Sequence, residues 1–291
     1  MEIVDAQIHR PRAALARESE LGADAADALA LEIEIAAMDA AGVDAAVVVG
    51  GGSGDRTAPL RFCAFAARRQ PDRFVGVVPV VDLDAQDHDG FIAGLRSRGI
   101  VGIRVAAVSP TRAHVQAHFD DGRYEPWFAA AERQGVPVCL YCAGVPHKAA
   151  RVARDHPGLT VIVDHIGMRH PPYDSAGPDL FDPLPDLLAL ARFPNVAVKF
   201  SGVPALSTEG YPFADVWPNA RRIIEAFGPA RLMWGSDYTR CAGMHTYSES
   251  VNFLRYSDEV SAADKELMFG GTLRRLFRWE KGVTSGVAPS P

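Results

Sequence analysis

Titratable side chains stand at the ends of several apolar runs in this sequence. The run at 232–234 is followed by Gly-Ser and then by the carboxylate of Asp237, while His9 and His165 end two other runs. A carboxylate can take a proton from water, and neighbouring histidines can fix its geometry or polarise a carbonyl group. We therefore predict a catalytic centre of Asp237, His9 and His165, together with Gln7.

Each of these residues also has a plain structural interpretation. Asp237 could cap the loop that follows it, as Asp often does after Gly-Ser, and either histidine could be a core side chain bonded to a backbone carbonyl. Gln7 and His9 are two residues apart, so in a strand both point to the same face. Their joint occurrence with Asp237 at equivalent strand ends favours one shared site.

Cationic side chains occupy similar positions. Arg104 and Lys199 lie near the ends of two apolar runs, Arg240 comes soon after the carboxylate, and Arg169 follows His165. Arginine offers a planar fork suited to a carboxylate. These residues predict a small anionic substrate, unless Arg104 and Lys199 instead pair with Asp164 or other buried acids.

Further candidates for substrate contact are Tyr141, Cys142 and Tyr238, with His170 as a weaker one. The tyrosines could supply hydroxyl donors or a stacking wall. Trp234, inside an apolar run, is expected in the core.

Apolar segments alternate with stretches of helical spacing along the whole chain. Strands are predicted at 2–9, 43–49, 73–80, 100–106, 136–142, 159–166, 195–201 and 231–237. Helices are predicted at about 27–41, 57–69, 84–98, 123–134, 145–155, 181–192, 216–227, 246–255 and 262–278. Continuous apolar strands separated by helices indicate a parallel sheet buried on both faces.

Eight such units favour a closed (β/α)8 TIM barrel, an α/β fold, over an open sheet. The C-terminal strand ends then converge on one pocket. We expect a single domain at 1–281, irregular segments at 107–122 and 202–215 that cover the site, and a disordered tail at 282–291. The glycines at 50–54 match no phosphate-binding spacing and predict a flexible loop.

Composition narrows the partners. The formal net charge of -6 argues against a nucleic-acid surface, and no apolar run reaches the ~20 residues of a membrane span. The first strand begins too early for a signal peptide, and the spacing of the four cysteines is not that of a zinc ribbon. We expect a cytoplasmic protein with reduced thiols that binds a small molecule; the sequence leaves homo-oligomerisation open.

Six short motifs, taken in order, resemble the amidohydrolase superfamily. They are IVDAQIH at 3–9, GIR at 102–104, GVPV at 135–138, VDHIG at 163–167, VKFSG at 198–202 and MWGSD at 233–237. The resemblance is to the amidohydrolase-2 branch, which includes lactonases, pyrone-dicarboxylate hydrolases and metal-dependent decarboxylases of aromatic acids. It covers nearly the whole chain and implies the barrel fold.

The family pattern implies a His-x-His pair on the first strand, one His each on the fifth and sixth, and an Asp on the eighth, often around a divalent metal. By position, His9, His165 and Asp237 match members of this set. Gln7 stands where the first His of the pair is expected, and the fifth strand reads Tyr141-Cys142 in place of a histidine.

These departures weaken a metal site. A carboxamide is a poor ligand for zinc or manganese beside imidazole, so a metal, if one binds, would have His9, His165, Asp237 and Cys142 as ligands. We expect no cofactor, with zinc or manganese as the alternative, and a site that is metal-free or binds metal weakly.

The favoured function is hydrolysis of a small carboxylated lactone or related cyclic ester, with Asp237 activating water. A carboxylate of ordinary pKa, ~4, is a modest base, adequate for an activated ester and poor for an amide. The alternatives are a metal-dependent decarboxylase of an aromatic or unsaturated acid and a non-catalytic barrel subunit.

Overall fold

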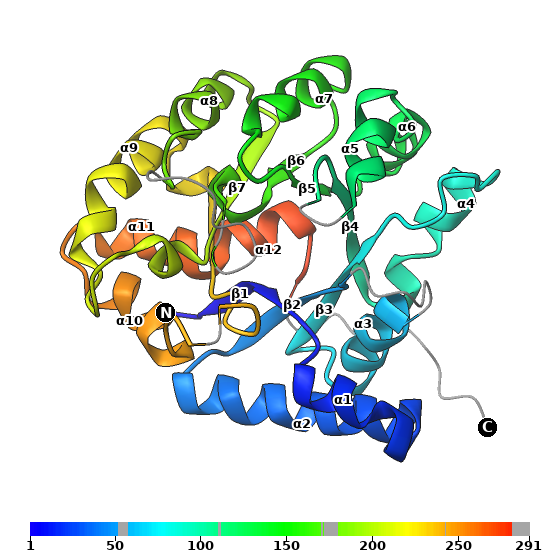
Figure 1. Ribbon diagram of the computed structural model, residues 1–291, viewed down its shortest axis with the longest axis horizontal. Helices are drawn as coiled ribbons and strands as arrows, with labels where there is room; N and C mark the ends of the chain where they lie inside the picture. Colours follow the sequence, from blue (N-terminus) through cyan, green and yellow to red (C-terminus); the bar gives the residue numbers. More distant parts are fainter. Residues whose placement is uncertain (52–57, 110–111, 170, 172–179, 242, 281–291) are drawn as a thin grey trace.

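Eight parallel strands form a single sheet in the computed structural model, which describes residues 1–51, 58–109, 112–169, 171, 180–241 and 243–280. The strands pair in chain order from β1 to β8 and are ringed by helices (Figure 1). Their bounds are β1 Val4–Ile8, β2 Ala45–Val49, β3 Phe74–Pro79, β4 Ile100–Ala106, β5 Val138–Tyr141, β6 Val161–Val163, β7 Val196–Ser201 and β8 Leu232–Gly235. The predicted (β/α)8 barrel is confirmed.

The first and last strands are joined by a buried carboxylate. Asp5 accepts hydrogen bonds from the backbone N–H of Gln7 (2.8 Å) and of Ser236 (2.9 Å), and from the Ser236 hydroxyl (2.5 Å). A backbone hydrogen bond from the N–H of Asp237 to the carbonyl of Gln7 (3.0 Å) also links the end of β8 to β1. Burial raises the pKa of Asp5 to about 6. This side chain therefore brings the Gln7 strand against the turn that carries Asp237.

Helices surround the sheet between successive strands (Figure 1). Their bounds are α1 Arg12–Leu21, α2 Ala23–Ala41, α3 Ala58–Arg69, α4 His88–Ala93, α5 Ala113–Asp120, α6 Glu125–Gln134, α7 Ala149–Asp155, α8 Leu184–Ala189, α9 Trp217–Phe227, α10 Tyr247–Arg255, α11 Ala262–Glu266 and α12 Thr272–Phe277. The prediction missed α1 and treated 107–122, which contains α5, as irregular. Both helices are short and have weak amphipathic patterns.

The last predicted helix, 262–278, is divided into α11, a π-helical turn at Leu267–Gly271 and α12. In the segment 202–215, short 3-10 turns form at Val203–Leu206 and from Ala214. The glycine loop beyond position 51, His170 and the tail at 282–291 lie outside the described residues.

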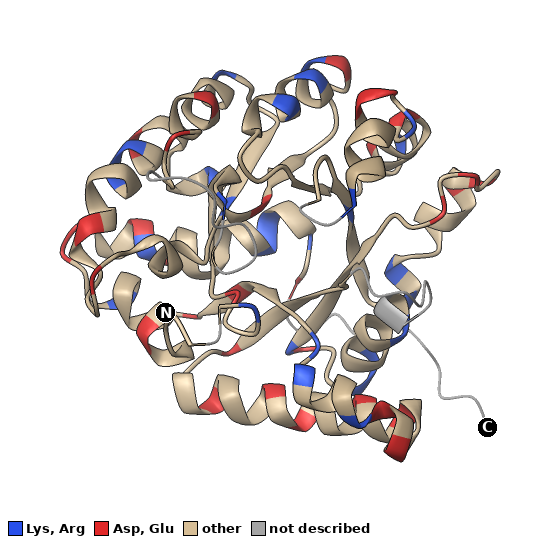
Figure 2. Ribbon diagram, viewed as in Figure 1, with Lys and Arg blue, Asp and Glu red and all other residues tan. Residues whose placement is uncertain are grey.

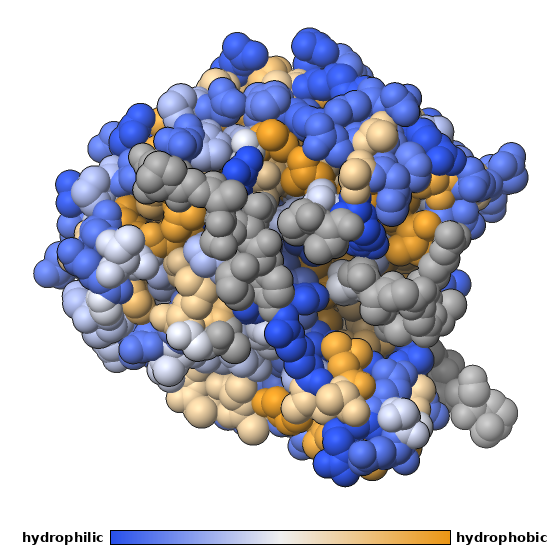
Figure 3. Space-filling view, viewed as in Figure 1, coloured by the Kyte–Doolittle hydropathy of each residue, from blue (hydrophilic) through white to orange (hydrophobic). Residues whose placement is uncertain are grey.

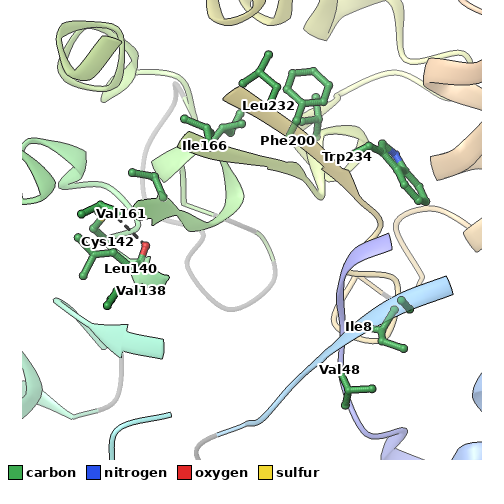
Figure 4. Close-up of a cluster of buried hydrophobic side chains, with 14 of the residues drawn as sticks. Ile8, Val48, Val138, Leu140, Cys142, Val161, Ile166, Phe200, Leu232 and Trp234 are labelled. Atoms are coloured by element: carbon green, nitrogen blue, oxygen red, sulfur yellow. Dashed lines mark hydrogen bonds between the residues drawn. The ribbon is translucent and has the colours of Figure 1, made fainter. Parts of the chain in front are cut away.

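The two faces of the sheet bury two separate apolar clusters. The inner cluster takes side chains from every strand, and it is completed by Leu273 and Phe277 of α12 and by Trp279 just after that helix. The outer cluster lies between the strands and the helices, and Figure 4 shows part of it, from Ile8 to Trp234. Trp234 is 1% exposed and donates to the Ser250 carbonyl (3.2 Å), as expected for a core residue.

A bulge in β1 redirects the residues that follow it. Asp5 pairs with Ala46 but Ile8 pairs with Val48, so three steps on β1 match two on β2. A bulge of this kind turns later side chains to the other face. Val4 and Ala6 lie in the inner cluster before the bulge, and Gln7 and His9 point inward after it.

The outer surface is mixed in charge. Acidic and basic residues both occur over the surrounding helices (Figure 2), and hydrophilic residues dominate the face shown in Figure 3. Among the described residues, no helix combines the length and apolarity that a membrane span requires.

Candidate active site

Two of the predicted catalytic residues sit in strained backbone. Asp237 lies two residues beyond β8 with φ at 49°, and His165 lies two residues beyond β6 with φ at 51°. Left-handed backbone is uncommon outside glycine, and each instance costs on the order of 1–3 kcal/mol. Such residues cluster at functional sites, where surrounding structure holds the strain. His165 lies in a 3-10 turn, Asp164–Gly167. Strand β6, which was predicted to extend to residue 166, ends at Val163.

The predicted catalytic side chains meet at the C-terminal end of the barrel. His9 Nε2 lies 3.3 Å from Asp237 Oδ1, and His165 Nδ1 lies 3.8 Å from Asp237 Oδ2. All three residues are at most 5% exposed. The structure therefore brings together one carboxylate and two imidazoles from strands far apart in sequence.

The sequence prediction missed Ser201, which contacts this group. Its hydroxyl lies 2.9 Å from His165 Nδ1. Ser201 ends β7 two residues after Lys199, and alternation along a strand places both on the inner face. The two-residue spacing between Lys199 and Ser201 was the feature of the sequence from which Ser201 could have been predicted.

His245 is a second residue that the prediction missed. It lies in the loop after β8, buried, with Nδ1 3.1 Å from the Thr246 carbonyl. Burial lowers its pKa, and the charge of Asp237 opposes that effect. A single histidine in a loop gave no pattern from which to find it.

Lys199 lies inside the barrel, below the mouth. Its side chain is 0% exposed, and Nζ lies 2.6 Å from Gln7 Oε1 and 3.1 Å from Asp164 Oδ1. These neighbours engage the ammonium group from two sides, and Gln7 links it to His9. Binding of substrate by Lys199 stays a prediction.

Arg104 forms the ion pair that the alternative interpretation anticipated. Its Nε donates to Asp164 Oδ2 at 2.7 Å. Burial would raise the pKa of Asp164, but Lys199 and Arg104 outweigh it and hold that pKa well below its usual range. The Arg104 guanidinium also lies 5.2 Å from the centre of the Tyr141 ring. The bond to Asp164 engages the Nε–H, which is one of the five N–H donors of the guanidinium.

Arg240 is the second cation beside the Asp237 carboxylate. Burial lowers its pKa, and its charge interacts with those of Asp237 and Arg104. A side chain at Gly51 would come within 2.9 Å of Arg240 Nη2, so the glycine leaves room for this arginine. Arg169 packs similarly against Gly144, 2.4 Å from where a Cβ would stand.

Cys142 and Tyr238 turn away from Asp237 and its two histidines, which corrects their assignment to substrate binding. Cys142 shares the outer face with Leu140, whose carbonyl accepts from its thiol (3.8 Å; Figure 4), and burial raises the pKa of this thiol. Tyr238 donates to Glu34 of α2 (2.8 Å) and stacks on Tyr247. Tyr141, the last residue of β5, points to the inner face of the barrel. The centre of its ring lies 6.2 Å from that of His165.

The donor atoms do not fit a divalent metal. His9 Nε2, the nitrogen that faces Asp237, is 2.9 Å from the Gln7 amide nitrogen, and Cys142 lies in the outer apolar layer. Within the described ranges, no three His, Cys, Asp or Glu side chains are grouped so as to hold an ion. All four cysteines are free and buried.

A family model described as amidohydrolase matches residues 4–279. The chain belongs to this amidohydrolase family. Among named relatives of this amidohydrolase, an L-fucono-1,5-lactonase from Burkholderia multivorans is 27% identical over 224 residues, 70% of this chain and 72% of that protein. The resemblance inferred from the motifs is confirmed, and the chain is an enzyme of the amidohydrolase family.

Solved structures share the barrel. An amidohydrolase from Burkholderia multivorans with bound HEPES superimposes with a TM-score of 0.73 at 22% identity, covering 96% of this chain and 100% of that one. A crystal of it in another space group contains zinc. A candidate 2-pyrone-4,6-dicarboxylic acid hydrolase from Pseudomonas putida gives 0.71 at 21% identity, covering 96% and 98%. At these identities the likeness shows the fold.

Proposed function

We propose that this amidohydrolase opens a small lactone that carries a carboxylate, with Asp237 as the base that activates water. The observation that carries the proposal is the placement of Asp237. Its carboxylate is 4% exposed, is held in a strained turn at the barrel mouth and lies beside two imidazoles. A loop cap needs none of these neighbours.

The reaction follows from this arrangement. Asp237 takes a proton as the water oxygen bonds to the lactone carbonyl carbon, which yields a tetrahedral oxyanion. The ring C–O bond then breaks, and the departing alkoxide takes the proton from Asp237, so the product is a hydroxy acid and the carboxylate is restored. General-base assistance of this kind contributes roughly 10²–10⁴-fold.

Two arginines supply the positive charge. Arg104 and Arg240 both interact electrostatically with Asp237, so both act at the same mouth. Asp164 is already balanced by Lys199, which lies deeper in the barrel, and by the Nε of Arg104. The other N–H donors of Arg104 and the charge of Arg240 beside Asp237 support an anionic substrate, and the planar fork of Arg104 suits a carboxylate.

Names of relatives support the ester class. The L-fucono-1,5-lactonase is named for a lactone, and the Pseudomonas putida neighbour for a pyrone dicarboxylate. The decarboxylase alternative requires a metal as electron sink, which the donor set described above does not favour. A non-catalytic barrel would not need the catalytic group to be retained.

The proposal is tested with a panel of four compounds: a neutral sugar lactone, a lactone with a carboxylate, an open-chain ester and an aromatic carboxylic acid. Proton release is followed with a pH indicator, and CO2 is measured in parallel. We expect proton release without CO2, fastest for the carboxylated lactone. CO2 release from the aromatic acid would overturn the proposal, and equal rates on both lactones would remove its anionic part.

A further inference from the structure

Lys199, Gln7 and His9 form a chain of contacts in which the ammonium of Lys199 fixes the orientation of the Gln7 amide. The ammonium of Lys199 can only donate, and it lies 2.6 Å from Gln7 Oε1. Asp164 Oδ1, 3.1 Å away, holds this ammonium from the other side. The amide of Gln7 is therefore oriented with its oxygen toward Lys199 and its NH2 group toward His9.

The two nitrogens of His9 are then assigned by their neighbours. Nδ1 lies 2.7 Å from the Val49 carbonyl oxygen, which can only accept, so Nδ1 carries a hydrogen. Nε2 has two polar neighbours: the Gln7 amide nitrogen at 2.9 Å, which can only donate, and Asp237 Oδ1 at 3.3 Å, which as a carboxylate oxygen accepts. The closer contact, with the amide, requires a lone pair on Nε2. If both nitrogens of His9 were protonated, the Nε2–H would face an N–H of the Gln7 amide, with the two nitrogens 2.9 Å apart.

We propose that Lys199 and Gln7 are a positioning pair that locks His9 in its neutral Nδ1–H tautomer, with the Nε2 lone pair occupied by the Gln7 amide. Burial lowers the pKa of His9 and outweighs the opposing effect of the Asp237 carboxylate, so it acts in the same direction as the Gln7 contact.

Two consequences follow for the site. The nitrogen that would ligate a metal is already engaged, and His9 has no Nε2 proton to give to a substrate, so proton transfer falls to Asp237. The inference rests on the proposed function only for this second consequence. Its test needs no substrate, so its failure and the failure of the lactonase proposal are distinguishable.

The test is NMR of protein labelled with 15N in histidine, at about pH 7. A His9→Phe spectrum identifies the two His9 nitrogens by their absence. In the wild type we expect a protonated Nδ1 and an unprotonated, hydrogen-bonded Nε2. A protonated Nε2 in the wild type would overturn the proposal.

The decisive variant is Gln7→Glu. The carboxylate keeps the shape and the contact with Lys199 but turns an acceptor toward His9, so both nitrogens of His9 should carry hydrogens. A merely structural Gln7 predicts no such change. A His9 that stays neutral in a Gln7→Glu protein with the other histidine signals in place would overturn the proposal.

A matched variant, Gln7→Met, removes the amide without adding charge. His9 should keep its Nδ1 hydrogen through Val49, while Nε2 moves toward the shift of an unbonded nitrogen; an unmoved Nε2 signal contradicts the proposal. Zinc chloride added in equimolar amount to the wild type should leave the His9 signals in place. A stoichiometric shift of Nε2 on zinc addition would show that its lone pair is available and would overturn the lock.

Discussion

Replacing Arg104 by methionine separates its two roles in the site. The side chain pairs with the buried Asp164 and, in our account, also binds the substrate carboxylate. Losing one partner of a buried charge pair across a binding site costs about 2–4 kcal/mol. At 1.36 kcal/mol per tenfold, kcat/KM should fall by roughly 30- to 1,000-fold. Most of the loss should appear in KM, because a clamp remote from the reacting carbonyl provides uniform binding.

The same substitution should also lower stability, by an amount that the structure limits. Breaking a buried pair costs on the order of 3–5 kcal/mol when a charge is left alone. Here Lys199 still lies 3.1 Å from Asp164 Oδ1, so we expect a loss below about 3 kcal/mol. Urea denaturation measures this term independently of substrate.

Steady-state kinetics on the carboxylated lactone then distinguish the roles, with Arg104→Lys as the matched control that keeps the charge without the fork. We expect Arg104→Lys to recover stability more fully than KM. An Arg104→Met enzyme with lower stability but unchanged kcat and KM would refute substrate binding by this residue.

Three further outcomes are expected. Burial raises the pKa of Glu34 from 4.5 to about 8. Between these two pH values the folded protein keeps a proton that the unfolded chain loses. The free energy of unfolding should therefore fall as pH rises from 4.5 to about 8, by at most about 1.4 kcal/mol per pH unit. Urea denaturation at several pH values should show a shallower slope for Glu34→Gln, and an identical slope would contradict this assignment. Cys142→Ala should retain kcat/KM while losing about 1 kcal/mol of stability, because the thiol packs in the outer layer; a large kinetic loss would place the thiol in the site. EDTA treatment should leave the initial rate unchanged, whereas activity restored only by zinc or manganese would revive the metal alternative.

The barrel could be predicted from sequence because each strand is a short, continuous apolar run. Such runs report burial on both faces, and eight of them separated by helices leave few other arrangements. Helices α1 and α5 were not found, since both have weak amphipathic patterns. Strand ends were overestimated where the chain turns sharply, as at His165.

The site could be predicted in part, because strand ends of a barrel converge. Convergence says which residues are near one another, but not which way each side chain points. Cys142 differs from Tyr141 by one position, and alternation sends its thiol to the outer layer. The bulge in β1, which aims Gln7 inward, has no signature in the sequence. The role of Asp5, which joins the first and last strands, was also missed, because it depends on backbone geometry that the sequence does not reveal.

The central claim, that Asp237 activates water, is tested most directly by the turnover of Asp237→Asn. Asparagine tolerates the left-handed backbone at this position and keeps the shape of the side chain, but it cannot accept a proton at neutral pH. We expect kcat to fall by roughly 10²–10⁴-fold, with KM and melting temperature near those of the wild type. The decline of kcat at acid pH, which the wild type should show, should be missing from any residual activity. Near-normal turnover with about 1 kcal/mol lost from stability, as for a lost cap, would contradict the account and remove Asp237 from the mechanism.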